Sequence, residues 1–322
     1  MIRILFTFIL FCFFSSILGQ VKVLDSISKK PIPFVAVTFD ENNGLYTNQI
    51  GEFDLNVITK DTIVLYSLGH KQKTVSLKLL KDQTIYLVPI NITLNEIVVS
   101  NKKKKSKSKK VKPIKHNDFL KSYGLLIGEE MAIYVPNNQA NYDNELKNIL
   151  IPVVTKTISF EKSFVGKSQR IKKLPFSALF KISFYQNIEG IPGEKLYDEI
   201  IAIKIDEKLK IASLDLENYD IEIPKEGFFV GMLNLGKTDI NGKLISSSPF
   251  VYKKIKNKTK KVLIRTKPFF PIYFKEKSHK TYLRYTFSKN KVWKPLVMYG
   301  SMKKYKFHNI SLGYEIKMYL KD

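Results

Sequence analysis

The last strand-like segment of the chain alternates strictly between apolar and other residues. Its apolar positions, two residues apart, are Ile310, Leu312, Tyr314, Ile316, Met318 and Leu320. Successive side chains of a β-strand point to opposite faces, so this spacing predicts a strand that buries one face. Similar short segments separated by turn residues recur along the chain, and strand-forming residues are abundant. We therefore predict an all-β protein.

The chain has 322 residues, of which 44% are apolar and 12% aromatic, enough for two domains with real cores. We predict a signal peptide over residues 1–19 and a first β-sandwich over residues 20–100. A lysine-rich linker over residues 101–117 and a larger β-sandwich over residues 118–322 complete the predicted organisation.

The first nineteen residues have the composition of a secretory signal. Arg3 precedes an apolar run that is short for a membrane span, and small residues follow it. Cleavage after Gly19 makes Gln20 the first mature residue, and it predicts a protein of the periplasm, the outer membrane or the cell surface. A retained membrane anchor is the alternative. Cys12 is the only cysteine, so the mature chain is expected to have no disulfide and no cysteine-based metal site.

The net charge of +25 is distributed unevenly. Residues 20–100 are neutral, whereas residues 101–115 contain nine lysines, and arginine occurs at only four positions. Specific nucleic-acid readers use the bidentate arginine fork, so we expect no nucleic-acid partner for this exported, arginine-poor chain. Like charges resist packing, which predicts a solvated, extended tether. Peripheral contact of this tether with anionic lipid or polysaccharide is a secondary hypothesis.

The first domain resembles a known family. The segments DSISKKPIPFVAVTF, GLYTNQIGEFDL, DTIVLYSLGHKQKTVSL and TIYLVPINITLNEIVVS are similar to the carboxypeptidase-regulatory-like domain of Bacteroidetes envelope proteins. The positions that carry this resemblance and that we regard as structural are Gly44, Thr47, Asn48, Gly51, Phe53 and Gly69. The resemblance implies a seven-stranded, transthyretin-like sandwich. Within it, GLYTNQIGEFDL reads as a hairpin whose Asn48 and Gly51 need a positive φ.

The domains that accompany this family in other proteins, a zinc carboxypeptidase or the barrel of a TonB-dependent receptor, are not expected in this chain. None of the four histidines has glutamate at the third position, as a His-x-x-Glu zinc site requires. The 222 residues after the first domain are too few for a plug and a barrel. Adjacent acids such as Glu129 and Glu130 face opposite ways on a strand. We therefore expect no enzyme, no metal and no cofactor.

Aromatic residues are concentrated near the C-terminus among lysines and arginines. The candidate ligand face consists of Tyr273, Phe274, Tyr282 and Trp293. Amphipathic rings stack on sugars and attract cations, but the same residues also serve as core packing of a large sandwich.

The segment YQNIEGIPGEKLYDEII resembles the crossing loop of jelly-roll-like modules, which include many carbohydrate-binding domains. The favoured interpretation is an exported, non-enzymatic envelope protein that binds or scaffolds an envelope protein or an anionic polysaccharide. The alternatives are a carbohydrate-binding module for polysaccharide capture and a hydrolase whose carboxylates converge only in the fold.

Overall fold

The computed structural model describes residues 19–80, 83–90, 106–139, 141–155, 157–163, 166–172, 175–255, 258–263, 265–298 and 300–320. Within these ranges the chain forms strands and short 3-10 turns, without an α-helix, which confirms the all-β prediction. The predicted signal peptide, apart from Gly19, lies outside the described residues, as does the start of the predicted linker. None of the described helical turns has the length and apolar character needed to cross a membrane.

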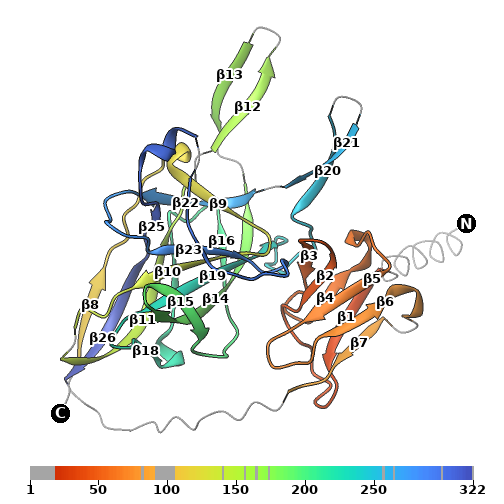
Figure 1. Ribbon diagram of the computed structural model, residues 1–322, viewed down its shortest axis with the longest axis horizontal. Coiled ribbons are helices and arrows are strands. Elements are labelled where there is room, and N and C mark those ends of the chain that lie inside the picture. Colours follow the sequence, from red (N-terminus) through yellow and green to blue (C-terminus); the bar gives the residue numbers. More distant parts are fainter. Residues whose placement is uncertain are drawn as a thin grey trace, which may run out of the picture.

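A smaller module (residues 19–90) contains seven strands in two sheets, as the resemblance implied (orange in Figure 1). One sheet has the order β4-β1-β7 and the other the order β3-β2-β5-β6. The strands are β1 (Gln20–Asp25), β2 (Ala36–Asp40), β3 (Asn43–Tyr46), β4 (Glu52–Asp54), β5 (Thr62–Tyr66), β6 (Lys73–Ser76) and β7 (Thr84–Leu87), with the 3-10 turns η1 (Leu55–Val57) and η2 (Leu77–Leu79). Alternate residues of both sheets, among them Val21, Val37, Phe53 and Leu65, form its core.

The expected hairpin over GLYTNQIGEFDL is wrong, because its two strands belong to different sheets. Strand β3 pairs with β2, whereas β4 pairs with β1. Gly51 has the expected positive φ of 75°, and a Cβ there would lie 2.6 Å from the carbonyl oxygen of Val23. Asn48 does not have a positive φ. Its Oδ1 instead accepts hydrogen bonds of 2.9 Å from the backbone N–H groups of Ile50 and Glu52, which fixes the turn between the sheets.

A larger module (residues 106–320) consists of antiparallel sheets around one core. A seven-stranded sheet has the order β15-β14-β19-β10-β23-β24, with β16 also on β14. A five-stranded sheet has the order β17-β11-β26-β8, with β18 on β11, and a three-stranded sheet has the order β25-β22-β9. The strands of these three sheets are β8 (Ser106–Val111), β9 (Ser122–Leu126), β10 (Glu129–Val135), β11 (Tyr142–Pro152), β14 (Ser177–Ile188), β15 (Ile191–Lys195), β16 (Ile201–Asp206), β17 (Ile211–Asp215), β18 (Ile221–Glu222), β19 (Phe228–Lys237), β22 (Arg265–Tyr273), β23 (Thr281–Tyr285), β24 (Lys294–Pro295), β25 (Asn309–Ile310) and β26 (Gly313–Leu320).

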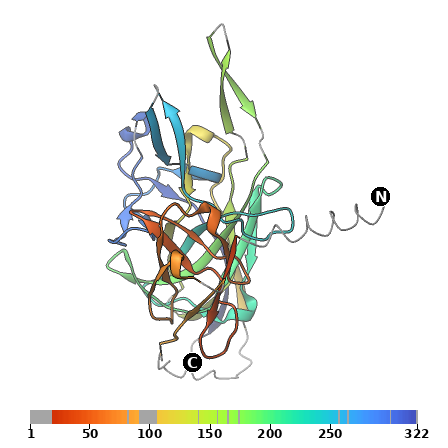
Figure 2. The same ribbon diagram turned by 90° about the vertical axis from the view of Figure 1, so that its right-hand side faces the viewer.

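Two hairpins project from the same end of the larger module (Figures 1 and 2). They are formed by β12 (Thr157–Ser163) with β13 (Gly166–Lys172), and by β20 (Phe250–Ile255) with β21 (Lys258–Leu263). The remaining elements are the 3-10 turns η3 (Phe119–Lys121), η4 (Glu217–Tyr219) and η5 (Gly300–Lys304). Turn η3 lies just before β9.

Part of the predicted tether is a strand. Residues Ser106–Val111 form β8, which pairs antiparallel with β26, so that Lys109 lies opposite Ile316 and Lys107 opposite Met318. The lysine side chains of β8 remain exposed. The predicted tether was expected to be extended, and these six residues are. Their pairing with the C-terminal strand β26 was not expected. The strand completes the edge of the five-stranded sheet with charged residues, which discourages further pairing.

The alternating C-terminal segment is divided between two sheets. Ile310 belongs to β25 and pairs with β22, whereas Tyr314, Ile316 and Met318 belong to β26. These four residues all lie in the core of the larger module, as predicted, but Leu320 at the end of β26 is 60% exposed.

The two modules are docked against each other through an apolar cluster and hydrogen bonds. Phe34, Ala36 and Tyr46 of the smaller module pack with Leu233, Phe287 and other residues of the larger one. The side-chain amide of Gln49 donates to the carbonyl oxygen of Gly242 (2.7 Å) and accepts from the N–H of Leu244 (3.1 Å). Further contacts join Tyr46 to Thr286 (2.5 Å), Asp54 to Ser246 (3.0 Å) and Lys243 to Glu52 (3.1 Å). Cavities between the modules therefore have fixed walls.

Candidate functional site

The outer face of the seven-stranded sheet carries charged and aromatic side chains between the strands' core residues. On β14, Ile182 and Phe184 point into the core, so Lys181 and Tyr185 point outward. The strand register aligns Lys181, Leu233, Glu130 and Arg284 in one row across four strands. Residues that are far apart in the sequence thereby become neighbours on this face.

Glu130 is the centre of a buried hydrogen-bond network. Its Oε1 accepts a 2.6 Å hydrogen bond from the Tyr185 hydroxyl, and its Oε2 accepts a 2.8 Å hydrogen bond from Nε of Arg284. Nη2 of Arg284 lies 2.6 Å from Oε2 of Glu130 and donates to the Tyr185 hydroxyl at 2.7 Å. The Glu130 carboxylate is therefore already neutralised by Arg284.

Gly231 makes this network sterically feasible. It lies on β19 opposite Ala132 on one side and Ser183 on the other. A Cβ at this position would be 2.5 Å from Cε2 of Tyr185 and 2.8 Å from Oε1 of Glu130. The missing side chain lets the Tyr185 ring lie across the sheet and reach the carboxylate.

Aromatic rings hold the guanidinium group of Arg284 in place. Its central carbon lies 4.2 Å from the ring centroid of Trp293 and 4.9 Å from that of Tyr185. Trp293 and Tyr185 meet edge to face at 5.4 Å. Cation–π contacts of this kind favour the charged guanidinium.

A cavity of about 180 Å³ adjoins this network between the two modules. We call it the basic cleft; it is lined by Phe34, Ala36, Tyr46, Tyr66, Ser67, Leu68, Glu130, Lys181, Ser183, Tyr185, Lys195, Leu233, Arg284, Thr286 and Lys291. Nζ of Lys195 is buried and has no hydrogen-bond partner in the described part of the chain. The neighbouring carboxylate is that of Asp198, whose Oδ1 lies 4.0 Å from Nζ of Lys195 and whose side chain is half exposed. Nζ of Lys291 lies 4.1 Å from the centroid of the Tyr66 ring, so a lysine of the larger module makes a cation–π contact with the smaller module.

Burial disfavours the charged form of the three lysines. It lowers the pKa of Lys181 to about 8, with a further contribution from the positive charge of Lys195. Burial also lowers the pKa of Lys195 and of Lys291. Arg284 differs: burial opposes its charge, but the Glu130 carboxylate together with Tyr185 and Tyr46 raises its pKa overall. An anion bound in the cleft would restore the favourable surroundings that these ammonium groups have lost.

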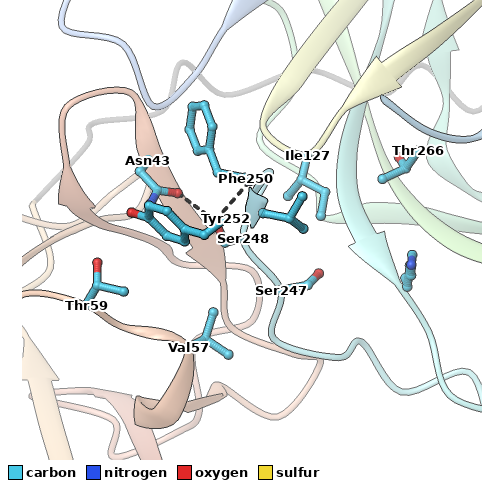
Figure 3. Close-up of a pocket in the computed structure, with 11 residues that line it drawn as sticks. Asn43, Val57, Thr59, Ile127, Ser247, Ser248, Phe250, Tyr252 and Thr266 are labelled. Atoms are coloured by element: carbon cyan, nitrogen blue, oxygen red, sulfur yellow. Dashed lines mark hydrogen bonds between the residues drawn. The ribbon is translucent and has the colours of Figure 1, made fainter. Parts of the chain in front are cut away.

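A second cavity lies at the base of the β20–β21 hairpin, again between the modules. Its volume is about 420 Å³. Figure 3 shows Asn43, Val57 and Thr59 of the smaller module on one side and Ile127 and Thr266 of the larger module on the other, with the segment from Ser247 to Tyr252 between them. We call it the polar cavity.

The four residues of the predicted ligand face occupy two separate places. Tyr282 and Trp293 belong to one aromatic cluster on the outer face of the sheet, together with Tyr185 and Phe229. Phe274 packs on the core of the larger module and stacks on Tyr305 at 4.0 Å. Tyr273, on β22, is half-buried, and burial raises its pKa to about 12. The structure thus brings Trp293 to the edge of the basic cleft but places Tyr273 and Phe274 elsewhere; a role of these four residues in binding stays a prediction.

The predicted motif residues of the smaller module lie at turns and packing positions. Gly44 lies under Phe287 of the larger module, where a Cβ would be 2.8 Å from the ring. The buried hydroxyl of Thr47 accepts from the N–H of Val35 at 2.8 Å, and Phe53 is in the core. Gly69 has a φ of 77°. At the predicted cleavage site, the carbonyl oxygen of Gly19 accepts a hydrogen bond from the N–H of Leu55, and Gln20 begins β1.

Sequence reasoning missed the lysines of the basic cleft. Among 50 lysines in the chain, Lys181 and Lys195 do not stand out by type. The signal that could have identified Lys181 is its place inside the apolar strand ALFKISFY, because a charge buried on either face of such a strand is costly. Lys195 carried no such signal.

The acidic pair Glu129 and Glu130 does not converge. The two side chains lie on opposite faces of β10, as expected from the strand's alternation. Glu129 accepts hydrogen bonds from the Tyr123 hydroxyl (2.8 Å) and from the N–H of Leu126 (3.0 Å), and burial raises its pKa. Among the described residues, no group of three His, Cys, Asp or Glu side chains lies close enough to hold a metal ion.

Comparison with known proteins identifies one part of the chain. Residues 19–99 match the family of the CarboxypepD_reg-like domain, so the smaller module is a domain of this kind. No curated protein and no solved structure matches the chain.

Proposed function

We propose that the protein is an exported, non-enzymatic binding protein of the bacterial cell envelope that holds acidic groups of an anionic polysaccharide in the basic cleft. The N-terminal sequence supports export to the periplasm, the outer membrane or the cell surface. The CarboxypepD_reg-like domain supports an envelope role, because the sequence resemblance connects it with envelope proteins.

The observation that carries the proposal is the excess of positive charge in the cleft. Lys181, Lys195, Lys291 and Arg284 line it, against the single carboxylate of Glu130. That carboxylate is hydrogen-bonded by Arg284 and Tyr185, and it favours the charged forms of Lys181 and Lys195 only through longer-range attraction, which does not outweigh their burial. Asp198, 4.0 Å from Lys195, offsets only part of the cost of desolvating these lysines, because their pKa values stay lowered, and a bound anion would offset more of it.

The shape of the cleft favours one acidic group of a longer molecule. A volume of about 180 Å³ accommodates a carboxylate or sulfate group with part of its ring. Tyr185 and Trp293 beside the cations provide aromatic surface of the kind that contacts sugar rings. A polysaccharide can present such groups repeatedly and continue out of the open side of the cleft.

A binding role suits Glu129 and Glu130 better than catalysis does. Glu129 lies 3.5 Å from Nη1 of Arg265, and Glu130 is bound by Arg284. A glycosidase needs two carboxyl groups facing one bond from opposite sides. Glu129 and Glu130 instead point away from each other and are each held by an arginine.

Equilibrium binding of polygalacturonate, an acidic polysaccharide, tests the proposal. We expect the full chain to bind it, and the double variant Lys181→Ala/Lys195→Ala to bind at least about tenfold more weakly, since hydrogen bonds to charged groups contribute about 1.5–3 kcal/mol each. The matched control is Lys225→Ala/Lys277→Ala, which removes two exposed lysines outside the cleft. Equal losses in both variants would mean non-specific attraction and would contradict the cleft as the site. Failure of the full chain to bind any acidic polysaccharide, polygalacturonate and a sulfated one included, would contradict the ligand class.

Export is tested separately with a reporter that is active only outside the cytoplasm. Fused after Gln20, it should be active in the envelope fraction. A reporter that stays in the cytoplasm would contradict the proposed localisation without affecting the binding result.

A further inference from the structure

The polar cavity contains polar groups that form no hydrogen bond with the described residues. Asn43 is 2% exposed, and its Oδ1 accepts a 2.9 Å hydrogen bond from the Ser248 hydroxyl, drawn as a dashed line in Figure 3. Its side-chain nitrogen donates to no group in the described part of the chain. The hydroxyls of Thr59 and Tyr252, which also line the cavity, make no hydrogen bond to the described residues either. Two donor–acceptor hydroxyls and one amide donor thus remain for a ligand.

Other groups in the same wall are held firmly. Ser248 also accepts a hydrogen bond of 3.1 Å from the N–H of Phe250, which fixes the start of β20. Nζ of Lys261 lies 4.2 Å from the centroid of the Phe250 ring and 3.2 Å from Oδ2 of Asp40. This contact joins the hairpin to the smaller module. The cavity is therefore preformed, which reduces the entropy lost when a ligand binds.

The charge of the polar cavity differs from that of the basic cleft. Lys237 is the single charged residue among the described residues that line it. Val57, Ile127 and Val251 add apolar surface, and Phe250 and Tyr252 add aromatic rings. An acidic ligand would have only Lys237 as a counter-ion, so an acidic ligand is disfavoured. A purely apolar ligand is disfavoured as well, because it would leave the amide of Asn43 and the two hydroxyls without hydrogen-bond partners.

We propose that the polar cavity binds a neutral sugar ring of a glycan. A sugar combines apolar C–H faces, which pack on aromatic rings, with hydroxyls that accept from the amide of Asn43 and exchange hydrogen bonds with Thr59 and Tyr252. The volume of about 420 Å³ is within the range of about 300–1,000 Å³ that small-molecule sites occupy. This site is distinct from the basic cleft and does not depend on the acidic ligand proposed for it.

The test uses three neutral hexasaccharides, built from β-1,4-linked glucose, α-1,4-linked glucose and β-1,4-linked mannose. Binding to the full chain is measured by saturation-transfer NMR and calorimetry. We expect at least one to bind. Tyr252→Ala should weaken that binding about tenfold through the lost ring contact, and Thr59→Val should weaken it roughly three- to tenfold through the lost hydrogen bond. Tyr252 is 56% exposed and Thr59 is exposed as well, so both variants should fold.

Two controls separate this site from the basic cleft. Tyr219→Ala removes an exposed tyrosine elsewhere, and Lys181→Ala/Lys195→Ala disables the cleft; both should leave the binding of the neutral sugar unchanged. The inference is overturned if none of the three hexasaccharides binds, or if Tyr252→Ala binds as tightly as the unaltered chain. Loss of neutral-sugar binding in the lysine double variant would also overturn it, because it would place the sugar in the cleft.

Discussion

The hydroxyl of Tyr185 donates a hydrogen bond of 2.6 Å to Oε1 of Glu130 across the outer face of the seven-stranded sheet. This bond joins β14 to β10 over the intervening strand β19, and it passes above Gly231. The network around Glu130 therefore depends on one residue that contributes no side-chain atom.

Gly231→Ala is expected to destabilise the protein by about 1–3 kcal/mol, the usual cost of overpacking. The added Cβ would overlap the Tyr185 ring and the Glu130 carboxylate. Urea unfolding at neutral pH measures the change. Ser183→Ala, in the cross-strand partner of Gly231, adds no atom and should cost less than about 1 kcal/mol. A Gly231→Ala variant as stable as the parent would show that the ring moves aside freely.

Glu130→Leu should cost about 3–5 kcal/mol, because it leaves the guanidinium of Arg284 partly buried without its counter-ion. The side chains of Glu130 and Arg284 are 3% and 23% exposed. The double variant Glu130→Leu/Arg284→Met removes both charges and should recover most of the loss. A double-mutant cycle on unfolding free energies measures this coupling. Additive effects of the two substitutions would contradict a coupled pair.

Anion binding in the basic cleft should weaken as the pH rises from 7 to 9. The pKa of Lys181 is about 8, so Lys181 loses most of its charge over this range. The resulting loss of affinity for polygalacturonate should reach up to about tenfold between these pH values. Lys181→Met should bind weakly at both values and show a flatter profile. An equally steep profile in this variant would assign the titration to another group.

The same lysine should make the protein more stable at alkaline pH. Its pKa is lower in the folded state than the ordinary value of 10.5, so the unfolded chain binds more protons between pH 8 and pH 10.5. The contribution of Lys181 to stability therefore rises with pH across this window. Urea unfolding of the parent and of Lys181→Met, compared at pH 7 and pH 10, isolates it. The two proteins should converge in stability at the higher pH.

Phe287→Ala should weaken the docking of the two modules. Phe287 is 5% exposed, and its ring packs against Gly44 of the smaller module and Gly128 of the larger one. We expect a loss of about 3–5 kcal/mol and two separate unfolding transitions in calorimetry. Phe228→Leu, within the core of the larger module, should lower the transition temperature without dividing the transition. A single transition in both variants would show that the other contacts between the modules suffice.

The sequence was informative where structure is local. Period-2 alternation predicted a strand at the C-terminal end of the chain, and it identified Tyr314, Ile316 and Met318 as core residues. It did not reveal strand partners, because pairing depends on residues far away in the chain. The segment from Gly44 to Leu55 has the residues of a hairpin, yet its strands join different sheets. The lysines of residues 106–111 likewise gave no sign of the apolar strand that they accompany.

The candidate site was less predictable than the fold, for the same reason. Glu130, Tyr185 and Arg284 become partners only through the register of β10, β14, β19 and β23. The docking of the modules adds Tyr66 to one side of the cleft and Asn43 to the polar cavity. Neither residue carries a chemical motif, so their role follows from position alone.

The first strand of the smaller module has a further consequence for how the chain is made. Strand β1 is the middle strand of its sheet, between β4 and the parallel strand β7, so that Val23 lies beside Ile85. This sheet cannot close until residue 87 has been synthesised, some sixty residues after the strand itself. At about 5–20 residues per second, β1 of a nascent chain therefore waits several seconds for its partner β7 to be synthesised. During that interval β1 lacks its parallel partner β7, so the smaller module can close only after the whole of residues 20–87 has been made.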